Sequence, residues 1–177
     1  MTAEEYIQLK AFARIDGALL SVMWIASFAL YVIGMTKPMM MIGGIIIAVS
    51  SPVFTASRVR KFRGIARYGI ISFGRAYIYS ILTFFYASLL FAIAQFVYFQ
   101  FIDGGYIISQ ITEMMSQEPN RQVIQAYGMT DTINESLSIM TKTRPIDYAV
   151  NYLTLNIMLG MVLGLPIAAL TKKDEKR

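Results

Sequence analysis

The sequence lacks cysteine and histidine altogether. Without cysteine, disulfide bonds and thiolate chemistry are excluded, and without histidine the commonest catalytic base and metal ligand are missing. No HExxH or GxSxG motif is present either. We therefore expect a non-enzymatic protein with no catalytic residues, no metal site and no cofactor.

Charge is also scarce. Charged residues make up 15% of the 177 residues, where a soluble domain carries about a quarter. The shortage is concentrated in four apolar runs, each long enough as a helix to cross a hydrocarbon core of about 30 Å. We predict an all-α integral membrane protein, one domain over residues 1–177, with transmembrane helices near 15–35, 38–57, 75–103 and 146–171. Thr2 and Glu5 match a capping box, which predicts an interfacial helix over Thr2–Arg14 leading into the first span.

Six cations with no acid among them lie between the second and third runs: Arg58, Arg60, Lys61, Arg63, Arg67 and Arg75. We predict that this stretch is a basic loop, partly helical on the membrane surface. The net charge of +5 would suggest nucleic acid in a soluble protein. Because the cations adjoin apolar runs, we expect anionic lipid headgroups as partners and no nucleic acid.

Residues 104–145 differ in kind from the spans. Apolar residues at helical spacing, together with Pro119 and Gly128 as boundaries, predict three short amphipathic helices. Thr132 and Glu135 match a second capping box. Such short helices are unstable alone, so their apolar faces must be buried on the protein's own spans, in the outer leaflet or in a partner's groove. We favour a cap on the spans whose residual patch binds a partner protein through adaptable side chains: Met114, Met115, Leu137 and Met140.

Three aspartates flank the spans, at positions 16, 103 and 147. We expect water to reach all three. Asp103 and Asp147 lie at the same face and could act together on a proton or a cation. For Asp147 we favour the simpler role of an anion at a helix N-terminus, since Pro145 opens the last helix.

Other polar and small residues within the spans favour helix packing. We expect interhelical hydrogen bonds, rather than a substrate path, from four amides: Gln95, Gln100, Asn151 and Asn156. Gly160 and Gly164 form a GxxxG motif, which brings helices close together either within one chain or in a homodimer. We favour the contact within one chain.

The run Tyr68–Tyr77 (YGIISFGRAY) opens the long aromatic third span, and a polar, Met-rich segment and a final span follow. In these features the chain resembles a family of unknown function whose members are small four-span inner-membrane proteins, common in Bacteroidota. The segments Glu4–Arg14 and Arg144–Tyr148 fit the same pattern. The resemblance implies a bacterial inner-membrane location and a four-span topology, and it implies no catalytic or binding residue.

Three classes of function remain open. The first is an accessory or interaction protein with an extracytoplasmic helical module. The second is a small transporter or channel subunit, against which we note no charge in the middle of a span and no inverted repeat. Enzymatic activity is the third and least supported class, because the sequence offers it only the pair Asp103 and Asp147.

The distribution of lysine and arginine predicts the orientation. Four spans place both termini on one side, which holds most of the 16 basic residues, including Lys172, Lys173, Lys176 and Arg177. By the positive-inside rule both termini are cytoplasmic and residues 104–145 are outside. Reporter fusions at Arg177 and near Gln125 should therefore report opposite compartments, and two cytoplasmic signals would contradict this threading.

Overall fold

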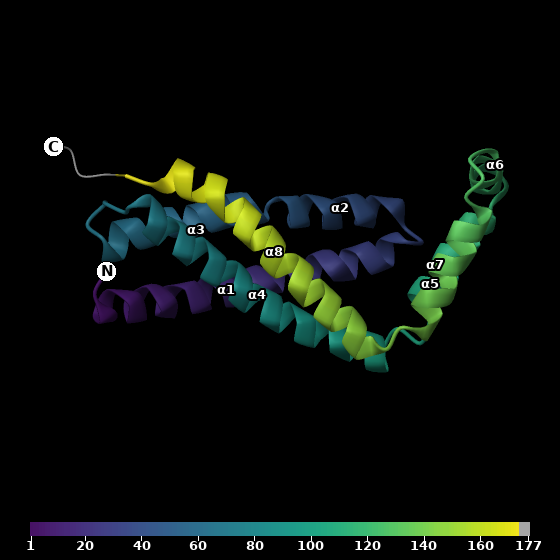
Figure 1. Cartoon of the computed structure of the whole chain (residues 1–177), viewed down its shortest axis with the longest axis horizontal. Coiled ribbons are helices and arrows are strands. Elements are labelled where there is room, and N and C mark those ends of the chain that lie inside the picture. The colour runs from purple at the N-terminus through teal and green to yellow at the C-terminus, as the bar shows by residue number, and fades with distance from the viewer. Residues whose placement is uncertain (174–177) are drawn as a thin grey trace. The chain divides into compact units, whose positions relative to one another are not determined.

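In the computed structural model, which describes residues 1–173, the chain forms eight helices (Figure 1). In chain order they are α1 (Ala3–Gly34), α2 (Pro38–Val49), α3 (Ser51–Ala66), α4 (Phe73–Phe101), α5 (Tyr106–Ser116), α6 (Glu118–Ala126), α7 (Thr130–Lys142) and α8 (Pro145–Thr171). They divide into two compact units, Met1–Ala94 with Val150–Arg177 and Gln95–Ala149. Lys176 and Arg177, which contribute to the predicted orientation, lie outside the described residues.

Four helical segments are long and apolar enough to cross a membrane: Ala3–Gly34, Pro38–Ala66, Phe73–Phe101 and Pro145–Thr171. This confirms the all-α fold with four spans. The second segment consists of α2 and α3, which meet at Ser50. Pro52 lies in the first turn of α3, where its missing N–H leaves no hydrogen bond unmade.

Two boundaries differ from the sequence prediction. The capping box of Thr2 and Glu5 is present, but α1 runs on without a break, so Thr2–Arg14 is not a separate interfacial helix. The second segment continues to Ala66, so the first four cations of the predicted basic loop lie on α3. Val59 and Phe62 are buried in the core, and this packing extends the helix past the end of the uncharged run.

In the first unit, α1 lies antiparallel to α2 and α3. Trp24 Nε1 donates a hydrogen bond to Ser51 Oγ at 2.8 Å, and the rings of Phe12 and Phe62 lie 5.3 Å apart between centroids. Toward the C-terminus of α1, the contacting residues on α3 therefore lie nearer the N-terminus of α3, as in an antiparallel pair. These contacts fix the register of the two helices.

Helix α4 packs against this pair over its aromatic side chains. Trp24 lies 5.9 Å from Phe84 and 5.7 Å from Phe91, measured between ring centroids. Gly17 permits the close approach, since a Cβ there would lie 2.6 Å from Tyr86 Cβ and 2.8 Å from the carbonyl oxygen of Thr83. The core is thus built around α4 as the common neighbour.

Helix α8 packs on α4 through the two glycines singled out in the sequence. A Cβ on Gly160 would lie 2.4 Å from Phe84 Cβ, and one on Gly164 would lie 3.0 Å from a ring carbon of Tyr77. The hydroxyl of Tyr77 also donates to the carbonyl oxygen of Met161 at 3.3 Å. Both glycines therefore face another helix of the same chain.

One end of the first unit is closed by backbone contacts, and we call it the basic end. Ile71, in the turn between α3 and α4, exchanges two backbone hydrogen bonds with Lys173, at 3.0 and 2.9 Å. Arg63 Nη1 donates to the carbonyl oxygen of Thr171 at 2.7 Å. The end of α8 is thereby attached to α3 and to the turn that follows it.

The second unit contains the end of α4, the helices α5, α6 and α7, and the start of α8. The three short helices occur as predicted, with Pro119 in the first turn of α6 and Gly128, at φ +64°, before α7. The second capping box is wrong: α7 begins at Thr130, so Thr132 already lies inside it and no side chain caps it. Tyr148 Oη donates to the carbonyl oxygen of Met140 at 2.7 Å and ties α7 to α8.

The close approach at Gly160 gives a stability prediction. Gly160→Ala inserts a methyl group where the backbone-proximal part of Phe84 already lies, and we expect a loss of about 1–3 kcal/mol of unfolding free energy. Unfolding in mixed detergent micelles, followed by circular dichroism, measures this loss. Gly74→Ala is the matched control, because nothing lies within 4 Å of a Cβ at that helical position. Equal stability of the two variants would contradict the packing.

Candidate functional site

The first candidate is a charged group buried within the spans. Asp16 is 2% exposed and lies on α1 at the start of its uncharged run. Arg58 Nε on α3 donates to Asp16 Oδ1 at 2.6 Å, and Arg58 Nη2 forms an ion pair with the same oxygen. Tyr79 Oη on α4 donates to the other oxygen, Oδ2. One carboxylate thus joins three helices.

Aromatic rings cover this ion pair. The ring of Phe62 stacks on Tyr79 at 4.8 Å, and the guanidinium of Arg58 lies 6.0 Å from the centroid of the Phe54 ring. The expectation that water reaches Asp16 is therefore wrong, because α1 and α3 continue past it and enclose it. Both oxygens already accept hydrogen bonds, which makes Asp16 a connector between helices rather than a free acid or base.

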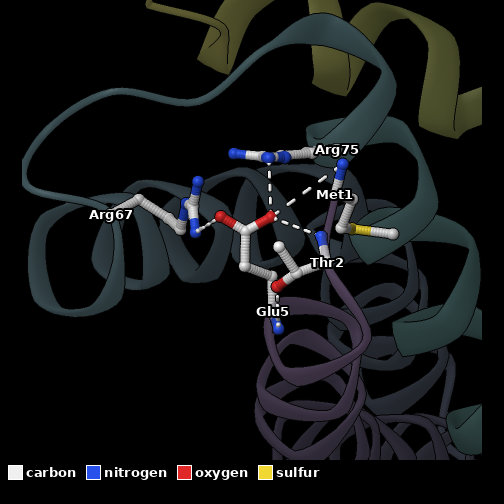
Figure 2. Close-up of polar contacts among 5 residues, drawn as sticks. All are labelled: Met1, Thr2, Glu5, Arg67 and Arg75. Atoms are coloured by element: carbon white, nitrogen blue, oxygen red, sulfur yellow. Dashed lines mark hydrogen bonds and ion pairs between the residues drawn. The ribbon is translucent and has the colours of Figure 1, made fainter.

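The second candidate is a cluster at the basic end, centred on Glu5 in the first turn of α1 (Figure 2). Arg67 Nη1 donates to Glu5 Oε1, and Arg75 Nη2 donates to Glu5 Oε2, both at 2.8 Å. The backbone N–H of Thr2 also donates to Oε2, at 2.9 Å, as part of the capping box. Arg67 follows α3 and Arg75 lies in the first turn of α4, so this carboxylate too joins three helices.

The predicted basic patch therefore separates into two sets. Four of its members bind groups inside the protein: Arg58, Arg63, Arg67 and Arg75. Arg60 and Lys61 are exposed and have no ion pair within residues 1–173. Lys10 and Arg14 on α1 are likewise exposed and unpaired in that part of the chain. The sequence prediction missed Glu5, Asp16 and Tyr79 as partners, although an acid near so many cations was a usable signal.

The two aspartates at the other span ends have separate partners. Asp103 is only 8% exposed, so the expectation that water reaches it is also wrong, and it accepts the backbone N–H groups of Gly105 and Ile107, at 3.0 and 3.2 Å. Asp147 accepts two hydrogen bonds from the Arg144 guanidinium, both at 2.9 Å, and one from its backbone N–H at 3.3 Å. Asp147 thus serves the start of α8, and its carboxylate raises the pKa of Arg144 through these hydrogen bonds. Neither aspartate offers an unoccupied carboxylate for shared chemistry.

Gln95 departs from the expected role. Its side chain is fully buried, and neither its amide nitrogen nor its amide oxygen has a hydrogen-bond partner among the described residues. The interhelical hydrogen bond that we predicted is therefore not formed in this part of the chain.

The predicted partner surface lies on α5 and α7 of the second unit. A hollow of about 240 Å³ opens between the short helices, and Met115 and Leu137 line it together with Ile124 and Ile133. Met114 is 48% exposed, while Met115, Leu137 and Met140 are half-buried. The four residues therefore do not form one uniform exposed patch. No group of three or more acidic side chains that could hold a metal ion occurs in residues 1–173.

Comparison with known proteins identifies the family but no relative of known activity. A family model described as a protein of unknown function, DUF4199, matches residues 16–173. This confirms the resemblance to a family of unknown function. No curated protein and no solved structure matches the chain.

The buried ion pair gives the next prediction. Asp16→Asn leaves the Arg58 guanidinium inside the protein without its counter-charge, and we expect a loss of about 3 kcal/mol or more of unfolding free energy. Asp147→Asn is the control, since it removes the same charge from an exposed pair that solvent screens, and we expect a clearly smaller loss. Unfolding in mixed micelles compares the two. Similar losses would mean that Asp16 is not buried as described.

Proposed function

The chain belongs to the DUF4199 family of proteins of unknown function, and we propose that it is a non-enzymatic accessory protein of the bacterial inner membrane. Its four apolar helices make it a multi-pass membrane protein. In this proposal the basic end and both termini are cytoplasmic and bind anionic lipid headgroups. Residues 104–145 lie outside and bind a partner protein.

The observation that carries the proposal is that carboxylates of the first unit form ion pairs within the protein. Asp16 and Glu5 each form ion pairs with arginine side chains, and each connects three helices. Catalytic acids and bases are usually groups whose protons can be exchanged with substrate in a cleft. Carboxylates engaged on both oxygens fit a scaffold better than a reaction centre.

The headgroup contact is supported by four cations that have no ion pair within residues 1–173. Lys10, Arg14, Arg60 and Lys61 are exposed on α1 and α3, beyond the ends of the uncharged runs. Basic residues in this position contribute about 1 kcal/mol each to attraction by an anionic leaflet. Their excess on one side also supports the cytoplasmic placement of that side.

The partner contact is supported by apolar side chains that the second unit leaves exposed on its short helices. Met114, Val123, Tyr127 and Ile139 are each about half exposed or more. Methionine and tyrosine suit adaptable protein interfaces because the first is flexible and the second combines an apolar ring with a hydroxyl group. A protein partner that covers these faces would complete their burial.

A transporter or channel subunit is the second proposal. Gln95, a buried amide whose polar atoms have no partner among the described residues, is the observation that favours it. Buried polar side chains in spans often mark substrate paths. Flux measurement after reconstitution into liposomes distinguishes this proposal from the first.

Purification in mild detergent, with co-purifying proteins identified by mass, tests the partner contact. Met114→Ser combined with Met115→Ser should lower thermal stability, because Met115 lines the hollow, and should abolish the association, because Met114 is exposed. The control is Gln122→Ser with Thr141→Ser, two exposed residues outside the hollow. A double methionine variant that stays fully stable and keeps the same partners would contradict the proposal.

A further inference from the structure

Arg67 and Arg75 converge on a single carboxylate at the basic end (Figure 2). Arg67 directly follows α3 and Arg75 lies on α4, and each binds a different oxygen of Glu5. The two guanidinium groups carry two positive charges against one negative charge. This arrangement has the form of an anion-binding site in which a side chain of the protein takes the place of the anion.

We propose that Arg67 and Arg75 form a binding site for the phosphate group of an anionic lipid headgroup, and that Glu5 occupies this site as an internal competitor. The inference rests on the proposed contact between the basic end and anionic lipids. It names the two arginines that bind the phosphate group. It also predicts that removing the charge of Glu5 raises the affinity for the lipid, whereas removing the arginines lowers it.

The donors in the cluster exceed what a carboxylate uses. Only Nη1 of Arg67 and Nη2 of Arg75 bind Glu5, so the carboxylate uses one terminal nitrogen of each guanidinium group. A guanidinium group offers its donors as a planar fork that matches two oxygens of a phosphate. A phosphate group has more oxygens than the Glu5 carboxylate, so in its place it can accept from both terminal nitrogens of an arginine and not from one alone.

The cluster lies at the depth where headgroups are expected. Arg75 directly precedes the uncharged run that begins at Ala76. Thr171, which ends the uncharged run of α8, is bound by Arg63 one turn before Arg67. Arginine side chains at such a border meet lipid phosphate groups rather than hydrocarbon.

The cluster is also accessible, in contrast to the pair formed by Asp16. The side chains of Glu5, Arg67 and Arg75 are 28%, 19% and 26% exposed, whereas that of Asp16 is 3% exposed. Ion pairs that water reaches are weak, and the first turn of a helix opens readily. A headgroup can therefore displace Glu5 at low cost, which does not hold for Asp16, because that carboxylate is enclosed even though its partner Arg58 is 22% exposed.

Titration of the full chain in a neutral detergent with short-chain phosphatidylglycerol tests the site, with binding measured by calorimetry or native mass spectrometry. Glu5→Gln keeps the capping box, since glutamine serves at the same position, but removes the competing charge. We expect this variant to bind the lipid about fivefold more tightly. Glu4→Gln, an exposed neighbour with no arginine partner within residues 1–173, should change affinity less than about twofold.

The arginine variants complete the design. Arg67→Gln with Arg75→Gln, made in the Glu5→Gln background, should reverse the gain and lower affinity at least tenfold. A thermal unfolding profile of each variant verifies that it is folded. Equal effects of Glu5→Gln and Glu4→Gln would overturn the site, because the gain would then be a general effect of net charge.

Further arms separate this inference from the proposed function. If Arg60→Gln with Lys61→Gln weakens binding while the Arg67 and Arg75 changes do not, the site is wrong and the broader headgroup contact stands. If the unaltered chain and every variant bind phosphatidylglycerol no more tightly than phosphatidylcholine, the site and the broader headgroup contact are both wrong. If inorganic phosphate binds as tightly as phosphatidylglycerol, the site recognises free phosphate and the proposed lipid ligand is wrong.

Discussion

The structure of the first unit depends on the enclosure of one carboxylate. Asp16 lies where the apolar part of α1 begins, and its charge would oppose burial without compensation. Arg58 supplies the opposite charge and Tyr79 a hydroxyl donor, from two other helices. The three helices therefore meet at this level, where the carboxylate has both of its partners. The aromatic packing around the pair then follows from that meeting point.

The same arrangement recurs nearer the ends of the helices with a different degree of exposure. Glu5 joins α1 to the end of α3 and the start of α4, as Asp16 does deeper in the unit. The deeper carboxylate is sealed by Phe62 and Tyr79, while the outer one is partly open to solvent. A closed network suits permanent assembly, and an open one suits exchange with a ligand. In the site that we propose, the deeper layer thus serves structure and the outer layer serves recognition.

The sequence predicted the elements better than their partners. Uncharged runs located all four spans, and turn residues such as Pro119 and Gly128 located the short helices, because both signals are local. The end of α3 was placed too early, since its continuation depends on the burial of Val59 and Phe62 against distant helices. The internal roles of Arg58 and Arg67 were missed for the same reason. Pairing between residues far apart in sequence is set by register, which composition does not encode.

The register of α1 against α3 has a mechanical consequence for the bilayer. Contacts from Trp24 with Ser51, through Asp16 with Arg58, to Glu5 with Arg67 hold the two helices at one relative height. Sliding by one helical turn, about 5.4 Å, would break all of them together. When the hydrocarbon core becomes thinner or thicker, these helices must therefore tilt as one body instead of shifting past each other. Bilayer thickness then acts on the inclination of the pair, with both helices responding equally.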